Sequence, residues 1–165
     1  MNEQHKTSIS FFNYAHSYAS SARALRGADV DATHPDGPVY FLYFHAIELY
    51  LKSYLMAFGF TEGQLRKRKY GHNICCLANE AEGHGLTLAD TDRHVVLHLS
   101  ESDNIMTSRY IKLGVHSRLP FDVLHETCYR LHAEIGPKAY EGSGVTRRPV
   151  LPPGPVNMLK SIESR

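Results

Sequence analysis

The chain has 165 residues, a formal net charge of +1 and 42% hydrophobic residues. A chain of this length can bury a sizeable core as one domain without disulfide or metal staples. Its balanced charge excludes a globally basic protein, so any contact with nucleic acid has to come from a local patch.

Cysteine usage and the first residues both point to the cytoplasm. The three cysteines, two of them adjacent at Cys75 and Cys76, form neither an even disulfide framework nor a C-x-x-C spacing. This pattern favours reduced thiols. The first residues also lack the apolar segment and the small-residue cleavage site of a secretion signal. We therefore expect a cytoplasmic protein.

The first half of the chain predicts two long helices. Apolar residues recur every three or four positions over residues 7–26, which is typical of an amphipathic helix. A loop rich in Asp, Gly and Pro follows over residues 27–38. Residues 39–58, VYFLYFHAIELYLKSYLMAF, are apolar almost throughout, and their length favours a buried helix over a strand. A membrane span is the rival interpretation, but ionisable groups are costly at mid-bilayer. We expect the central helix of a bundle.

Three ionisable residues of this helix, His45, Glu48 and Lys52, lie on one face, because offsets of three and seven residues fall within about 60° of arc. Two interpretations are open. Glu48 and Lys52 fit an ordinary solvated ion pair of roughly 0.2–0.5 kcal/mol. Alternatively, a helix that is apolar elsewhere turns this polar stripe toward a cleft or a subunit interface, where the groups are desolvated and chemically tuned.

The next segment carries the densest positive cluster of the chain, Arg66, Lys67, Arg68 and Lys69. Gly59 before it suits the end of the central helix. The basic run is compatible with a solvated loop. It is also compatible with a phosphate-contact patch, because it lies ahead of a helix N-terminus.

The remaining elements complete a bundle. We expect a short helix that opens at residues 71–73 and ends near Gly83 or Gly85, a helix over about 87–106, and an irregular segment over 104–120. The last helix runs over 120–135 and is closed by Gly136 and Pro137. The sequence thus predicts an all-α, up-and-down bundle of about five helices over residues 1–140. An extended tail rich in Pro and Gly follows over 141–165 and is suited to packing on a partner subunit.

The stretches FLYFHAIELYLKSYL, KYGHNICCLANEAEGHGL and SRYIKLG resemble a bacterial branch of the HEPN domain family over roughly residues 11–135. The resemblance implies an all-α homodimer that binds RNA, or cleaves it without a metal ion, often in a toxin–antitoxin or phage-defence setting. Cleaving members carry an Arg, a polar residue, a few spacers and a His, a spacing that Arg93 to His98 fits and Arg109 to His116 fits more loosely. The positions that match the branch are His45, Glu48, Lys52, His72, Arg109 and Tyr110.

Metal-independent RNA cleavage needs a base for the 2′-hydroxyl proton and a cation for the charge on the phosphate, and His and Arg supply them. Arg93 and His98 lie about 140° apart on a helix, so they would cooperate best across a dimer interface. The alternative is that they only solvate the outer side of their helix. We favour a site in which the polar stripe meets His72 and Arg109. Its rival is a structural network, with Arg109 paired to Glu48 and His72 capping its own helix.

Three functions are therefore considered. The first is an HEPN-like RNA-binding protein or metal-independent endoribonuclease, with the basic run at the rim of its site, Tyr110 beside the RNA and an antitoxin as a candidate partner. The second is a non-catalytic helical module that partners a nucleotidyltransferase-like protein. The third is a metal-dependent hydrolase, which only the i, i+4, i+8 spacing of Asp90, His94 and His98 supports. With eleven histidines in the chain such a spacing is expected by chance, and we predict no cofactor.

Overall fold

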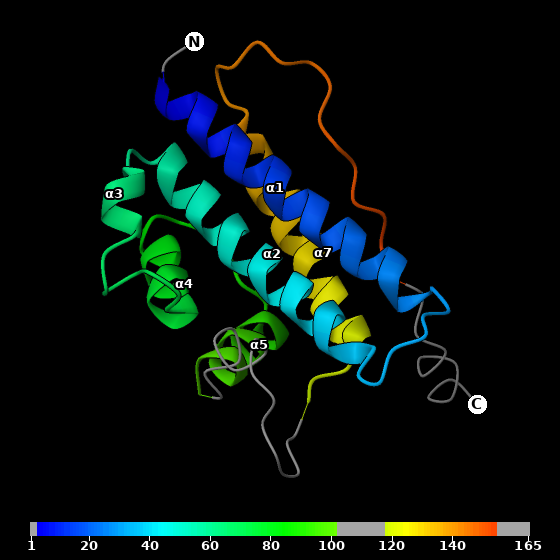
Figure 1. Ribbon diagram of the computed structural model, residues 1–165. Coiled ribbons are helices and arrows are strands. Elements are labelled where there is room, and N and C mark those ends of the chain that lie inside the picture. Colours follow the sequence, from blue (N-terminus) through cyan, green and yellow to red (C-terminus); the bar gives the residue numbers. More distant parts are fainter. Residues whose placement is uncertain (1–2, 102–117, 155–165) are drawn as a thin grey trace, which may run out of the picture.

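The computed structural model describes residues 3–101 and 118–154 (Figure 1). Within these ranges the chain forms six helices and no strand, which confirms the predicted all-α bundle. None of these helices is both long enough and apolar enough to cross a membrane. The helices are α1 (Glu3–Arg26), α2 (Asp36–Ala57), α3 (Glu62–Leu65), α4 (Ile74–Gly83), α5 (Asp90–Glu101) and α7 (Phe121–Ala139).

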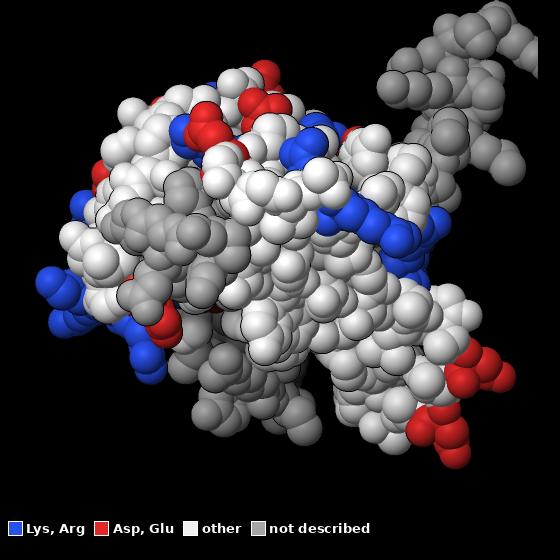
Figure 2. All heavy atoms as spheres, turned by 90° about the horizontal axis from the view of Figure 1, so that it is seen from above, with Lys and Arg blue, Asp and Glu red and all other residues white. Residues whose placement is uncertain are grey.

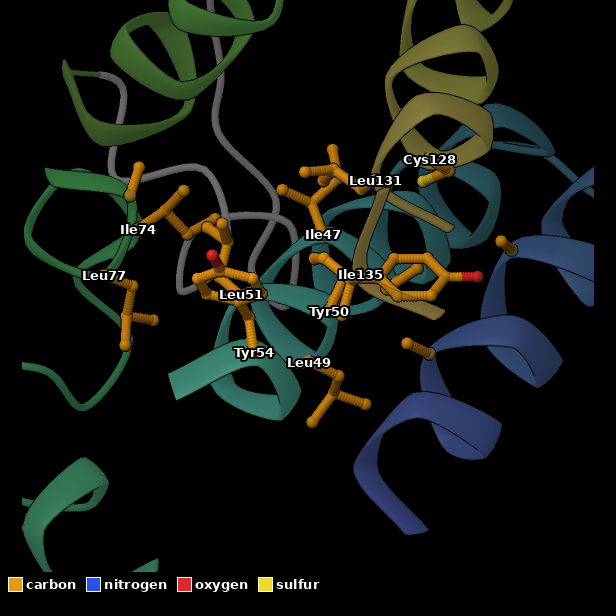
Figure 3. Packing of buried hydrophobic residues seen from close by; sticks show 14 of the residues in the cluster. Ile47, Leu49, Tyr50, Leu51, Tyr54, Ile74, Leu77, Cys128, Leu131 and Ile135 are labelled. Atoms are coloured by element: carbon orange, nitrogen blue, oxygen red, sulfur yellow. The ribbon is translucent and has the colours of Figure 1, made fainter. Parts of the chain in front are cut away.

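Helix α2 is the central element, as its composition predicts. It packs against α1 and α7 on one side and against α4 on another. Figure 3 shows Ile47 and Leu51 of α2 between α4 and α7. Full burial of an aliphatic side chain of this size contributes about 1.5–3 kcal/mol. The residues labelled around them are Ile74 and Leu77 of α4, and Cys128, Leu131 and Ile135 of α7, all of which are buried.

Helices α1 and α2 are antiparallel, whereas α7 runs parallel to α2. The Ser8 hydroxyl near the start of α1 donates to the carbonyl of Ser53 near the end of α2, at 2.8 Å. By contrast, α2 residues 43 and 50 pair in the same order with α7 residues 125 and 132. The close approach of α1 is possible because small side chains line its inner face, namely Ala15, Ala19 and Ala22, all fully buried.

The end of α2 follows the prediction for Gly59. The φ angle of Gly59 is +93°, and its N–H donates to the carbonyl of Met56 at 3.0 Å. The N–H of Phe60 donates to the carbonyl of Leu55 at 3.2 Å, which completes a Schellman motif. This turn sends the chain back along α2 and so brings the following loop beside the polar stripe.

Several elements differ from those predicted. Helix α1 begins at Glu3 instead of residue 7, and α2 begins at Asp36 instead of residue 39. The sequence pattern missed α3, a single turn held by a capping box between Thr61 and Gln64. Helix α5 begins at Asp90 instead of residue 87, and its predicted continuation to residue 106 lies partly outside the described residues, as does most of the irregular segment 104–120. The predicted end at Ile135 is wrong, because α7 continues through Pro137 to Ala139. Pro137 removes one hydrogen bond near the end of the helix, and burial of Ala139 offsets this loss.

The first part of the tail packs on the bundle of its own chain. From residue 144 to residue 154 it forms neither helix nor strand, as predicted for this part of the tail. It returns along the bundle beside α1, as the orange to red segment of Figure 1 shows. Packing of the tail on a partner subunit stays a prediction.

Candidate functional site

Glu48 is the centre of the candidate site. Its side chain is 1% exposed, and its Oε1 accepts a hydrogen bond from Lys52 Nζ at 2.5 Å. The Lys52 side chain is itself only 10% exposed. His72 Nδ1 lies 3.1 Å from the other carboxylate oxygen. The stripe is therefore desolvated, so the interpretation as an ordinary solvated ion pair is wrong.

His72 reaches this carboxylate from the loop that precedes α4. It does not cap α4, because the side chain of Asn73 does so, accepting a hydrogen bond from the N–H of Cys76 at 3.0 Å. A carboxylate can only accept, so the proton between Glu48 and His72 is carried by Nδ1. A neutral His72 then has an unprotonated Nε2 on a ring whose side chain is 48% exposed. This tautomer is the one that a general base requires.

His45 is the outer member of the stripe. Its Nδ1 lies 3.9 Å from Glu48 Oε2, which is too long for a hydrogen bond but close enough for a charge interaction when the ring is protonated. Its ring stacks on Phe41 with centroids 5.8 Å apart, and the edge of Tyr18 meets it at 4.6 Å. These aromatic rings fix the orientation of His45.

The basic run is exposed, and its four cations differ in their partners. Arg66 pairs with Glu62 at 3.5 Å, and Lys69 lies 3.3 Å from Glu80. The hydrogen bond with Tyr70 is the main cause that raises the pKa of Lys69, and the hydrogen bond with Glu80 is the second. Within the described part of the chain, Lys67 and Arg68 form no ion pair. These two cations therefore remain available to an anionic ligand.

The basic residues do not merge into one large surface on the face seen in Figure 2. There, Lys and Arg side chains gather in separate groups at the left and the right, with uncharged surface and, along the top, acidic side chains between them. This agrees with the balanced charge of the chain and favours a ligand that contacts a small number of cations.

The other predicted site residues are placed differently. Arg93 is exposed and engages Glu82 through Nε at 2.9 Å and Nη2 at 2.6 Å, and its Nη1 donates to Asp90 at 3.1 Å. The hydrogen bond with Glu82 is the main cause that raises its pKa. The guanidinium of Arg93 is thus paired with two carboxylates, Glu82 of α4 and Asp90 of α5. Arg109 and Tyr110 lie outside the described residues, as does His116, so their roles stay predictions.

The spacing of Asp90, His94 and His98 is not realised as a ligand set. Over residues 3–101 and 118–154, no group of three or more His, Cys, Asp or Glu side chains is arranged to hold a metal ion. Asp90 instead accepts a hydrogen bond from Arg93. The third hypothesis thereby loses the pattern that suggested it.

Sequence reasoning missed a second buried carboxylate, Asp92. The guanidinium of Arg130 donates hydrogen bonds to this carboxylate from Nε at 2.8 Å and from Nη2 at 2.6 Å, and the Thr127 hydroxyl donates a third at 2.7 Å. The hydrogen bond with Asp92 is the main cause that raises the pKa of Arg130. This cluster joins α5 to α7. Its partners lie on different helices, so no spacing within one helix indicates it.

Sequence reasoning also missed two tyrosine–histidine pairs between α2 and α7. Tyr43 Oη lies 3.2 Å from His125 Nδ1, and Tyr50 Oη lies 3.0 Å from His132 Nδ1. Burial raises the pKa of both tyrosines and lowers the pKa of His132 to about 4. The equal seven-residue spacing on both helices is a signal that the sequence contains.

Of the two buried carboxylates, Asp92 is held by a guanidinium and a hydroxyl, whereas Glu48 is the one with a half-exposed histidine. The Glu48 group is therefore the candidate site, and the contact between the polar stripe and His72 is confirmed. No family model, curated protein or solved structure matches this chain, so the HEPN resemblance stays a prediction.

Proposed function

We propose that this chain is an HEPN-like RNA-binding protein that acts as a homodimer and cleaves RNA without a metal ion. One observation carries the proposal. The half-exposed ring of His72 is held through Nδ1 by the buried Glu48 carboxylate, three residues after Lys69 at the end of the basic run. This combines an oriented base with cations that attract phosphate.

The chemistry follows from the tautomer. Nε2 of neutral His72 accepts the proton of an RNA 2′-hydroxyl, and the 2′-oxygen attacks the adjacent phosphorus. The bond to the 5′-oxygen breaks, which leaves a 2′,3′-cyclic phosphate, and the departing oxygen takes a proton from water. Glu48 stabilises the imidazolium that forms, as a buried carboxylate does for a catalytic histidine. Lys52 balances the charge of that carboxylate before the reaction.

The basic run supplies the affinity in this proposal. Lys67 and Arg68 are exposed and form no ion pair with another described residue. Two phosphate contacts on single-stranded RNA correspond to a slope of about −1.4 in a plot of log affinity against log salt concentration. Binding should therefore weaken with salt, though less steeply than for a protein with an extended basic surface.

The test is cleavage of single-stranded and structured RNA by the full chain in the presence of EDTA. We expect cleavage that survives chelation and is lost in His72→Gln. The matched control is His84→Gln, because His84 is also an exposed histidine near a glutamate, 3.8 Å from Glu80, but lies at the other end of α4. Circular dichroism of each variant verifies that the bundle is folded.

Each outcome decides between the candidate functions. Cleavage by His72→Gln equal to that of the wild type would remove His72 from the mechanism. Salt-dependent binding without cleavage would leave an RNA-binding module. A folded protein that neither binds nor cleaves RNA would overturn the proposal and favour the non-catalytic helical module that partners a nucleotidyltransferase-like protein.

A further inference from the structure

Residues 149–152, Pro-Val-Leu-Pro, form a strap that is bound to α7 mainly through its backbone. The carbonyl of Pro149 accepts a hydrogen bond from His132 Nε2 at 3.0 Å, and the carbonyl of Pro152 accepts one from His125 Nε2 at 2.9 Å. The strap therefore runs antiparallel to α7. Leu151 is 2% exposed, whereas its neighbour Val150 is 80% exposed. One side chain and two carbonyls thus attach the strap.

The spacing of the donors matches the spacing of the carbonyls. His125 and His132 are seven residues apart on a helix, which corresponds to about 10.5 Å. Pro149 and Pro152 are three residues apart, which corresponds to about 9–10 Å in an extended chain. A proline at each end favours that extended form and has no N–H that would need a partner. The two histidines therefore recognise a short extended peptide with a central apolar residue.

The donors belong to the bundle and do not depend on the strap. Tyr43 and Tyr50 of α2 each place a hydroxyl against Nδ1 of a histidine. With the tyrosine donating to Nδ1, the neutral ring carries its proton on Nε2, where the strap binds. The ring of His132 also packs on Phe12 of α1, with centroids 4.7 Å apart. We name these residues, Tyr43, Tyr50, His125, His132 and Phe12, the strap-docking face.

The strap is joined to α7 by a connection that can extend. Gly142 and Gly144 have φ angles of +67° and +72°, and most of residues 141–148 are exposed. The Ser143 hydroxyl and N–H both bond to the carbonyl of Tyr140, which is a local turn. The nine residues 140–148 reach about 30 Å when extended. The same strap can therefore bind to its own bundle or to a neighbouring one.

We infer that the strap-docking face is an interaction surface for an extended, proline-flanked peptide, and that the strap of a second copy of this chain occupies it by exchange. The exchanged strap makes the same two hydrogen bonds and buries the same leucine. The closed form, in which the strap binds its own bundle, and the exchanged form therefore differ in free energy only through the conformation of the connection and the protein concentration. This surface lies about 140–160° around α2 from Glu48, so the inference does not depend on the proposed ribonuclease activity.

The test follows protection of one chain's strap by another chain. In the face variant, His125→Phe with His132→Phe, the strap loses both of its donors. Trypsin should then cut between Arg147 and Arg148 faster than in the wild type, because the protease also has to bind the strap residues that follow this bond. The strap variant, Leu151→Asp, places a charge at a buried position and keeps the face. Adding the strap variant should slow cleavage of the face variant about tenfold, once the concentration of the strap variant exceeds the dissociation constant of the exchanged strap about tenfold.

The control chain carries Leu151→Asp together with both histidine substitutions, and it should give no protection. The control chain keeps any other dimer interface, so protection by the strap variant alone is due to the strap-docking face. Mass spectrometry distinguishes the fragments of the two chains. An unchanged cleavage rate up to about 1 mM strap variant, the effective concentration typical of a short flexible linker, would overturn the inference.

A peptide covers the case in which the face variant does not fold. The synthetic segment GVTRRPVLPPG, residues 144–154, then replaces it as the protease substrate, with a matched peptide that carries Asp in place of leucine. Protection of the first peptide alone supports the inference, and equal cleavage of both overturns it. If Leu151→Asp itself is unfolded, Leu151→Ala takes its place.

Discussion

Replacement of Glu48 by alanine leaves the Lys52 ammonium without its carboxylate in a nearly dry position. Removing one partner of a buried ion pair costs about 3–5 kcal/mol. The Lys52 side chain retains 10% exposure, so its flexible stem can move the charge toward water. His72 is half exposed and regains water when the carboxylate is gone. We therefore expect the lower end of the range, a loss of about 3 kcal/mol in the free energy of unfolding.

Urea unfolding followed by far-ultraviolet circular dichroism measures this loss, because the chain contains no tryptophan for fluorescence. The double variant Glu48→Met with Lys52→Met is the matched comparison. It replaces both charges by apolar groups of similar length and should be more stable than Glu48→Ala by about 2 kcal/mol or more. Unfolding of Glu48→Ala within about 0.5 kcal/mol of the wild type would refute the reasoning, since that is the range of surface substitutions.

Three further predictions concern pH, the second carboxylate and a helix end. Burial lowers the pKa of His132 from 6.5 to about 4, so the unfolded chain binds more protons between these values. The contribution of His132 to the free energy of unfolding should therefore be complete above pH 6.5. It should fall by roughly 1–2 kcal/mol toward pH 4, after allowance for the partial exposure of the ring. In His132→Phe, a plot of urea midpoint against pH should be flatter. Asp92→Asn breaks the bidentate contact with Arg130 and should lower the free energy of unfolding by about 2–3 kcal/mol in the same assay. Thr127→Val removes one hydrogen bond and should cost about 1 kcal/mol. Equal losses in the two variants would argue against a dominant ion pair. A Cβ at Gly59 would meet no atom within 4 Å, but alanine would have to adopt a φ of +93°. Gly59→Ala should therefore lower the free energy of unfolding by about 1–2 kcal/mol, measured by thermal unfolding. No loss would show that the turn relaxes.

The central helix and its polar stripe were predictable because the physical constraint is local. A segment of twenty residues that is apolar almost throughout has to be buried, and its three ionisable groups at helical spacing then share one face. The contact of His72 with that face could not be derived from spacing, since it depends on the path of the loop after α2. The packing of bundle helices joined by short loops favours such a contact but does not fix its partners.

Boundaries and contacts between helices were less accessible. Pro137 marks a helix end in isolation, yet the burial of Ala139 and Tyr140 keeps α7 intact beyond it. The contact of Asp92 with Arg130 joins residues 38 positions apart, and no one-dimensional pattern encodes such a pair. The tyrosine and histidine pairs carry a partial signal in their equal spacing, but which helix faces which is decided by the topology.

The parallel arrangement of α2 and α7 has a consequence for the order in which the molecule folds. The antiparallel pair α1 and α2 is closed by a short loop, so it can form early from neighbouring sequence. The contact of Tyr50 with His132 spans 82 positions and requires the intervening segment to loop back first, at a higher entropic cost. The strap can attach only after that step, because its donors sit on α7. Refolding should therefore proceed from the N-terminal hairpin to α7 and end with the strap.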